Sequence, residues 1–331
     1  MDIDAFSAVN SDKWSRLHDL AYKRSLTGQE ADELLRLYQV TSSHLSLLRS
    51  VAPESGLSAS LSATLAQSRT RFTGARSNFM DDVAKFFVIA LPAAFYRLRW
   101  LTLWCGIAFC LVAGAYAWWI GSSPEALRAA FGSDERVRQY VEEDFINYYS
   151  ENPAASFAGA VWTNNAWICA QAVALGITGF WVPMILFMNA QGVGAAAGVF
   201  AAVGKSDVFF SYILPHGMME LTAVFIAAAA GLKIFWAWIA PGPRTRSQAV
   251  AQEGRSLITV ALGLVLVLFI SGIVEGFVTP SFLPVWAKLA IGAAVLAAYW
   301  VYALVPGKRA YLSGARGDLN DQDAGYSEIT A

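Results

Sequence analysis

Residues 213–231 read LPHGMMELTAVFIAAAAGL, a stretch that is apolar enough to cross a membrane and yet contains a proline, a histidine and a glutamate. An ionisable side chain in hydrocarbon costs several kcal/mol, so His216 and Glu220 are candidates for a functional site. They are four residues apart, which puts both on one face of a helix. This face continues with the small residues Ala223, Ala227 and Gly231. Such a face packs closely against another helix.

The composition of the whole chain supports a membrane protein. Of 331 residues, 56 % are hydrophobic and 15 % are charged, which is too apolar for an ordinary soluble domain. Residues 1–98 are polar and charge-rich, whereas nearly all long apolar runs fall in residues 100–305. The formal net charge of −1 gives no field that would attract nucleic acid. We therefore predict an all-α fold in which a cytoplasmic helical domain, residues 1–78, precedes a transmembrane domain, residues 99–305.

The apolar runs predict about six transmembrane helices, because each span needs roughly 20 residues. These runs are residues 100–121, 157–178, 182–203, 213–239, 256–277 and 285–305. A tight link joins the second run to the third, which predicts a helical hairpin. Pro215 near the start of the fourth run predicts an irregular entry turn or a short re-entrant piece.

Positive charges on the short flanks orient these helices. They precede the first span, separate the fourth from the fifth and follow the sixth, at Arg97, Arg99, Arg244, Arg246, Arg255, Lys308, Arg309 and Arg316. Six spans place all of these residues on one side, which predicts a multi-pass protein with both termini in the cytoplasm. No secretory signal is visible, since Asp2 and Asp4 stand where a basic segment would be.

The N-terminal domain reads as a set of helices. Apolar residues recur every three or four positions in residues 11–24 and 28–50, and a third helix is expected over 61–76. Thr27 and Glu30 have the spacing of a capping box, which predicts that the second helix begins just after Thr27.

Three further segments connect or flank the spans. Residues 79–98 are amphipathic and contain Pro92, which predicts an interfacial helix on the inner leaflet or, as the alternative, a core helix of the soluble domain. Residues 122–156 form an external acidic loop with a short helix around residues 134–150, which acts as a docking surface or as a solvated cap. Residues 306–331 are rich in glycine and aspartate and predict a disordered cytoplasmic tail.

Depth along the helices brings polar side chains of the second, fourth and fifth spans to the outer half of the membrane. These side chains are Asn164, Asn165, His216, Glu220 and Glu275, and we predict that they form one buried cluster. The cluster could be a proton- or cation-coupled transport site. Alternatively, it could hold helices together and satisfy backbone groups freed by a helix break at Pro215 and Gly217.

A metal site is a third reading of this cluster, because imidazole and carboxylate groups bind zinc and other divalent ions. The spacing is HxxxE rather than the HExxH of zinc proteases, and only one histidine is near. All three cysteines lie in apolar runs without a ligand spacing, so they predict neither disulfides nor metal ligands. We therefore predict no metal and no other cofactor.

The third span combines amides with small residues, which is typical of a helix interface. The residues concerned are Asn189, Gln191, Gly192, Gly194 and Gly198. The interface could join two subunits, or it could be packing within one chain.

Three segments together resemble the stage II sporulation protein M family of bacterial integral membrane proteins. They are NNAWICAQAVALGITGFWVPMILFMNAQGVG (164–194), LPHGMMELTAVFIAAAAGL (213–231) and SGIVEGFVTP (271–280). The LPHGxxE element is the most specific of them, and the resemblance covers roughly residues 80–305. It implies a protein of the bacterial plasma membrane without an established enzymatic activity. By motif it singles out Asn164, Asn165, Asn189, Gly192, Pro215, His216, Gly217, Glu220 and Glu275.

In spore formers the namesake of this family is a membrane scaffold that recruits peptidoglycan-degrading partner proteins, so the resemblance implies a role in membrane assembly. The N-terminal helical domain departs from the sporulation member, and longer members look like parts of systems with a MoxR-type ATPase and RDD-type membrane proteins. We expect a non-enzymatic scaffold, able to form a homodimer, that assembles membrane or envelope proteins in the lipid bilayer and is linked to envelope remodelling. The alternative is a transporter or channel for a proton, ion or small solute that uses the His/Glu cluster.

Overall fold

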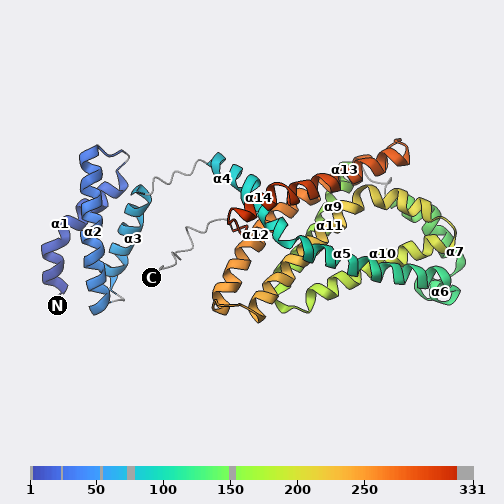
Figure 1. Cartoon of the computed structure of the whole chain (residues 1–331), viewed down its shortest axis with the longest axis horizontal. Coiled ribbons are helices and arrows are strands. Elements are labelled where there is room, and N and C mark those ends of the chain that lie inside the picture. Colours follow the sequence, from blue (N-terminus) through green and yellow to red (C-terminus); the bar gives the residue numbers. More distant parts are fainter. Residues whose placement is uncertain (1–2, 24, 53–54, 73–78, 149–153, 319–331) are drawn as a thin grey trace. The chain divides into compact units, whose positions relative to one another are not determined.

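The computed structural model describes residues 3–23, 25–52, 55–72, 79–148 and 154–318. The described residues contain helices and no strands, which confirms the predicted all-α fold. The chain divides into two compact units, Met1–Asp82 and Val83–Ala331, and each has its own hydrophobic core. Figure 1 shows the helices in sequence order from blue to red.

The first unit consists of three helices, α1 (Ile3–Tyr22), α2 (Gly28–Val51) and α3 (Gly56–Phe72). Its core is built from leucines of all three helices and Trp14 of α1. The predicted capping box begins α2: the Glu30 backbone N–H donates to Thr27 Oγ1 at 3.3 Å, and the Thr27 N–H donates to Glu30 Oε2 at 3.0 Å. The ammonium of Lys23 and these cap bonds lower the pKa of Glu30 to about 2.

Among its described residues, the second unit contains five helices that are long and apolar enough to cross a membrane. The first is α5 (Leu91–Ser122), which follows α4 (Phe79–Lys85) and the π-helical turn η1 (Phe86–Ala90) without a break. The others are α10 (Trp181–Ala202), α11 (Ser206–Ile239), α12 (Arg246–Ile273) with its extension η4 (Val274–Val278), and α13 (Val285–Leu304). They match five of the six predicted spans.

The remaining predicted span, residues 157–178, is occupied by α9 (Ala154–Ala174) and the short turn η3 (Gly176–Thr178). Helix α9 contains polar residues, so its mean hydropathy is lower than that of the five apolar helices. It nevertheless packs along α11 and α12. Turn η3 leads into α10 as the tight link of the predicted hairpin, but beyond this link the two helices separate, and α9 packs along α11 and α12 whereas α10 packs along α5. Gly179 lies in this link with a φ of +70°, a conformation that favours glycine.

Helix α11 is the centre of the second unit, because it contacts α5, α9, α10, α12 and α13. Its segment Ala227–Gly231 is buried. A methyl group added at Gly231 would lie 3.0 Å from Val182 Cγ2 and 3.2 Å from Gly176 Cα, so only a residue without a side chain fits there. The small face predicted from the sequence is therefore a tight packing surface.

The predicted break at Pro215 is wrong, because α11 runs continuously from Ser206 to Ile239 with Pro215 inside it. Neighbouring helices support this proline: α13 approaches so closely that a Cβ on Gly292 would lie 2.8 Å from the carbonyl carbon of Pro215. Gly217 likewise sits within the helix and marks no break.

The predicted interfacial helix 79–98 is also wrong as a separate element. Its residues run through α4 and the π-helical turn η1 into α5, and Pro92 lies just after that turn. Residues Leu91, Phe95 and Leu98 are buried in the core of the second unit, so the alternative of a core helix of the first unit is wrong.

The acidic loop contains more helix than predicted. It holds α6 (Pro124–Phe131), α7 (Asp134–Gln139), the π-helical turn η2 (Tyr140–Asp144) and α8 (Phe145–Tyr148). Phe145 packs on Phe200 of α10 and Phe209 of α11, which closes this end of the unit. Lys205 donates to Glu142 Oε1 at 2.9 Å, and this hydrogen bond lowers the pKa of the Glu142 carboxyl.

The predicted disordered tail 306–331 begins with ordered structure. Helix α14 (Pro306–Leu312) packs on α5 and α13, and the chain continues in defined contacts to Asp318. Residues 319–331 lie outside the described residues. In Figure 1, α14 lies beside α4 at the end of the second unit opposite α6 and α7.

The glycines of α10 form an interface within the chain. A Cβ on Gly194 would lie 2.8 Å from Tyr116 Cβ, and one on Gly198 would lie 2.9 Å from Ile120 Cβ, both in α5. Asn189 donates to the carbonyl of Ile185 in its own helix at 2.9 Å. Gln191 and Gly192 are exposed. Gly194 and Gly198 thus account for the close approach of α10 to α5.

Two neighbouring glycines of α10 give a matched test of this packing. Gly194→Ala should destabilise the second unit by about 1–3 kcal/mol, because the added methyl group overpacks the contact with α5. Gly192→Ala should change stability by less than about 0.5 kcal/mol, because nothing lies within 4 Å of the added atom. Thermal unfolding in detergent, followed by tryptophan fluorescence, measures both. Equal midpoints for the two variants would contradict the packing.

Candidate functional site

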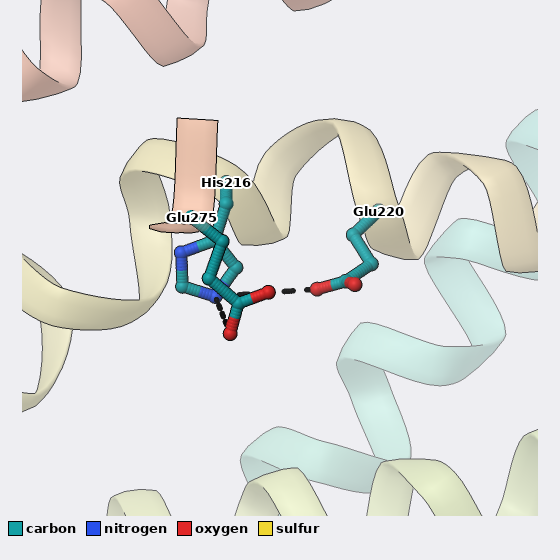
Figure 2. Close-up of side chains that lie close together, drawn as sticks. All are labelled: His216, Glu220 and Glu275. Carbon is teal, nitrogen blue, oxygen red and sulfur yellow. Dashed lines mark ion pairs between the residues drawn. The ribbon is translucent and has the colours of Figure 1, made fainter. Parts of the chain in front are cut away.

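Three ionisable side chains meet inside the second unit. His216 and Glu220 lie one turn apart on α11, and Glu275 lies at the start of η4, directly after α12. His216 Nε2 is 3.5 Å from Glu275 Oε1 and 4.0 Å from Glu220 Oε2. Figure 2 shows the imidazole and both carboxylates pointing toward one another. The predicted proximity of these three residues is therefore correct.

Only one of the two predicted asparagines joins this group. Asn165 of α9 donates a hydrogen bond from its side-chain amide to Glu220 Oε1. Asn164 is exposed on the surface of α9, so its predicted place in the cluster is wrong. Adjacent residues of a helix point about 100° apart, and the rotation of α9 that turns Asn165 toward Glu220 leaves Asn164 exposed.

Sequence reasoning missed the hydroxyl groups that complete the site. His216 Nδ1 is 3.1 Å from Thr279 Oγ1, and the Ser271 hydroxyl donates to the His216 carbonyl at 3.0 Å. Lys288 of α13 donates to the Thr279 carbonyl at 2.6 Å. Ser271 and Thr279 both lie in the segment SGIVEGFVTP, so the signal that could have found them was their presence with Glu275 in one short motif.

The turn that carries Glu275 is a π-helix, in which the Thr279 N–H donates to the carbonyl of Val274, five residues back, at 3.0 Å. A π-helical turn changes the direction of the side chains that follow an α-helix and is frequent at functional sites. The π-helical turn places Glu275 beside Nε2 of His216 and Thr279 beside Nδ1 of the same ring. His216, Glu220 and Glu275 form, among the described residues, a group whose possible metal-ligand atoms all lie within 4.8 Å of one another.

The site is enclosed. The side chains of His216 and Glu275 are 4 % and 3 % exposed, and that of Glu220 is 12 % exposed. Cavities of about 350, 370, 380 and 440 Å³ open elsewhere on the unit, and none of them is lined by a member of the cluster. Asp144 lines the cavity of 370 Å³, and the other three have no charged side chain in their linings.

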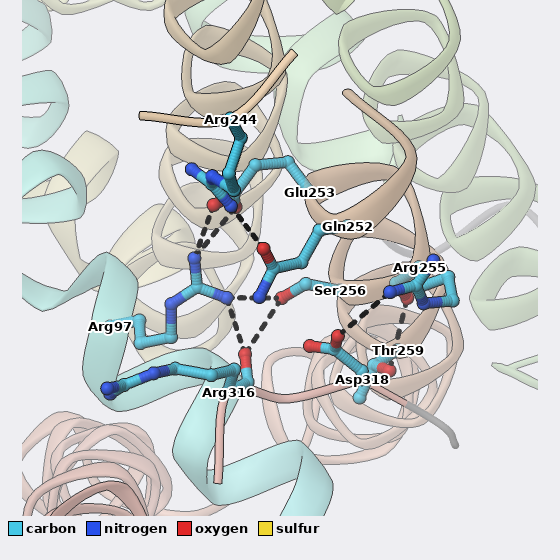
Figure 3. A network of polar contacts seen from close by, with 9 residues as sticks. All are labelled: Arg97, Arg244, Gln252, Glu253, Arg255, Ser256, Thr259, Arg316 and Asp318. Carbon is cyan, nitrogen blue, oxygen red and sulfur yellow. Dashed lines mark hydrogen bonds and ion pairs between the residues drawn. The ribbon is translucent and has the colours of Figure 1, made fainter. Parts of the chain in front are cut away.

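A second polar network lies at the end of the unit that carries α14, and the sequence did not predict it. Arg97 of α5 forms a two-pronged ion pair with Glu253 of α12, with distances of 2.6 and 2.8 Å from Nη2 to the two carboxylate oxygens. Arg97 Nη1 donates to the Arg316 carbonyl at 2.5 Å and to Ser256 Oγ at 3.2 Å. Figure 3 shows how these contacts gather around the chain after α14.

The segment after α14 is fixed by a second ion pair. Asp318, whose side chain is 2 % exposed, accepts from Arg255 Nη2 at 3.4 Å. Gly317 precedes it with a φ of +84°, and a Cβ there would lie 2.6 Å from Ala94 Cβ. Only glycine lets the chain pass so close to α5. The network therefore joins α5, α12 and the end of α14.

The fold and the enclosed polar cluster together define a polytopic α-helical membrane protein. A family model described as stage II sporulation protein M matches residues 106–280, and the chain belongs to that family. A second model, described as a domain of unknown function (DUF8413), matches residues 4–74, which correspond to α1–α3. No curated protein and no solved structure matches the chain.

The Arg97–Glu253 pair should contribute more to stability than an exposed pair. Glu253→Gln should destabilise the unit by about 3–5 kcal/mol, because it leaves the largely buried Arg97 without its counter-charge. Asp134→Asn is the control: its ion pair with Arg128 is exposed, so its loss should cost less than about 1 kcal/mol. Thermal unfolding in detergent at neutral pH measures both, and a Glu253→Gln effect no larger than that of the control would contradict the role of the network.

Proposed function

We propose that this protein is a non-enzymatic membrane scaffold that assembles partner proteins at the bacterial plasma membrane. The observation that carries the proposal is the division of the chain into two units with separate cores, of which the first matches a domain model of its own. A small helical domain joined to a family of membrane proteins is suited to holding a partner near the membrane. Membership of the sporulation protein M family is consistent with such a role.

The first unit offers a surface for a partner. Leu47 and Val51 lie one turn apart on α2 and are 45 % and 48 % exposed, whereas their neighbour Leu48 is fully buried. Exposed apolar side chains one turn apart are the anchors that helical partners use. A second candidate surface lies on the second unit, where α7 and η2 expose acidic side chains such as Glu135 and Glu143. It would suit a basic partner.

For orientation, we propose that both termini lie in the cytoplasm. Arg97 and the Arg316 carbonyl are hydrogen-bonded, so the beginning of α5 and the end of α14 lie at one end of the unit. The chain must traverse the unit an even number of times between them, which makes α9 a sixth crossing beside the five apolar helices. This end carries Arg97, Arg244, Arg255 and Arg316, and arginine-rich ends face the cytoplasm.

The second candidate function is coupled transport of a proton, ion or small solute. It is favoured by one observation: two carboxylates and an imidazole meet inside the membrane-spanning helices. Ionisable groups at such depth commonly mark transport pathways. The enclosure of the site, which none of the cavities described above reaches, supports the scaffold instead.

Cross-linking in intact host membranes tests the scaffold. We expect a stoichiometric partner to be cross-linked to the full chain and lost from a chain without residues 1–78. A photo-reactive residue at exposed position Leu47 should capture the same partner, and one at buried Leu48 should not. Recovery of only self-cross-linked protein from all of these chains would contradict the proposal.

Flux into proteoliposomes separates the two functions. If the chain is a scaffold, the purified protein should carry no pH-dependent flux above that of empty vesicles, with or without Glu220→Gln. Flux that is present in the natural sequence and lost in folded Glu220→Gln would establish transport instead.

A further inference from the structure

We propose that His216, Glu220 and Glu275 bind a divalent metal ion of the zinc type inside the second unit. The inference does not depend on the scaffold function, since it concerns what occupies the cluster rather than what the protein assembles. It revises the expectation from the sequence, where the HxxxE spacing and the single histidine argued against a metal. The third ligand comes from another helix, which the spacing along α11 cannot reveal.

The distances fit a metal site that is nearly formed. Zinc holds its ligands at about 2.0–2.2 Å in a tetrahedron, which separates the ligand atoms by about 3.4 Å. His216 Nε2 and Glu275 Oε1 are 3.5 Å apart, and the distance to Glu220 Oε2 is 4.0 Å. All three ligand atoms lie within 4.8 Å of one another. Small rotations of the two glutamate side chains would complete the contacts.

Two of the three ligands, Glu220 and His216, are oriented by a second contact that turns their other ligand atom toward the cluster. Asn165 occupies Oε1 of Glu220, so Oε2 faces His216. Thr279 occupies Nδ1 of His216, so Nε2 faces the carboxylates. A histidine ligand almost always has such a partner on its other nitrogen, which fixes the tautomer and the ring orientation.

The hydrogen-bond chain favours one histidine tautomer. The Thr279 hydroxyl donates to the Val274 carbonyl at 3.4 Å, which leaves its oxygen to accept from Nδ1–H of His216. A neutral imidazole of this tautomer directs the lone pair of Nε2 at the carboxylate oxygen of Glu275, 3.5 Å away. Two electron-rich atoms repel each other unless a metal ion or a proton lies between them, and the experiment below distinguishes these two.

An independent observation points to a ligand at the same place. Glu275 Oε2 is buried and has no hydrogen-bond partner among the described residues. A buried carboxylate oxygen without a partner carries the full cost of its lost hydration. A metal ion bound by both oxygens of the Glu275 carboxylate would satisfy it.

The charge balance favours a doubly charged ion. Two carboxylates at this depth carry up to two negative charges, and Lys288, the nearby cation described above, donates to a backbone carbonyl instead. Two like charges side by side in a medium of low dielectric repel strongly. One divalent ion neutralises both and bonds to the imidazole as well. Mixed imidazole and carboxylate ligands suit zinc, with iron and manganese as the competing ions.

Metal analysis of the full chain tests the proposal. The protein is purified in detergent without chelator, stripped with EDTA and titrated with Zn²⁺ and with Co²⁺. We expect one equivalent of zinc per chain by elemental analysis and a visible absorption band of Co²⁺ with nitrogen and oxygen ligands. The unfolding temperature of the stripped protein should rise when Zn²⁺ is restored.

Matched variants locate the ion. Glu275→Gln and Glu220→Gln should each lower zinc affinity by at least tenfold, whereas Glu143→Gln, an exposed carboxylate in η2, should not. His216→Cys keeps a metal ligand but changes its chemistry, so it should still bind Co²⁺ and show a new thiolate charge-transfer band. This gain of signal separates metal binding from a purely structural role.

The proposal is overturned if the folded natural sequence binds substoichiometric zinc and its unfolding temperature is insensitive to EDTA and Zn²⁺. It is also overturned if zinc binds equally to the natural sequence and to Glu275→Gln. In those cases protons, rather than a metal, neutralise the carboxylates.

Discussion

The structure depends on one constraint: α11 carries a proline, a histidine and a glutamate through an apolar layer and must be enclosed by other helices. A charged or hydrogen-bonding group exposed to hydrocarbon is costly, so α11 cannot face lipid at these positions. Its contacts with α5, α9, α10, α12 and α13 meet this requirement. The polar groups of the site on α11 then find partners on neighbouring helices, as Glu220 does with Asn165 and the His216 carbonyl does with Ser271.

Close enclosure requires small residues where the helices cross. Gly231 lets the α9–α10 hairpin reach the backbone of α11, and Gly292 of α13 lies against Pro215. This second contact explains why a proline is tolerated within α11, since the surrounding helices fix the segment whose own hydrogen bond is missing. The polar site and the small-residue contacts are therefore parts of one arrangement rather than separate features.

The sequence predicted the depth of the polar groups along their helices correctly. It did not predict how those helices are rotated about their axes or which distant segments supply the partners. Residue counting along apolar runs placed His216, Glu220 and Glu275 together, because depth follows directly from the rise per residue. It could not choose between Asn164 and Asn165, because that choice depends on how α9 is rotated against α11. The segment ending at Asp318 was read as disordered from its glycine and aspartate content, yet Gly317 allows a close passage and Asp318 meets Arg255.

Helix α12 meets neighbouring helices through polar contacts at both of its ends. Glu253 near its beginning binds Arg97 of α5, and Glu275 just after its end faces His216 of α11. At about 1.5 Å per residue these two carboxylates are separated by about 33 Å along the helix. A shift of α12 along its axis would break both contacts, and a tilt would open at least one of them. Because alternating access requires bundles of helices to rock against one another, this double attachment favours a membrane unit that acts as a rigid platform.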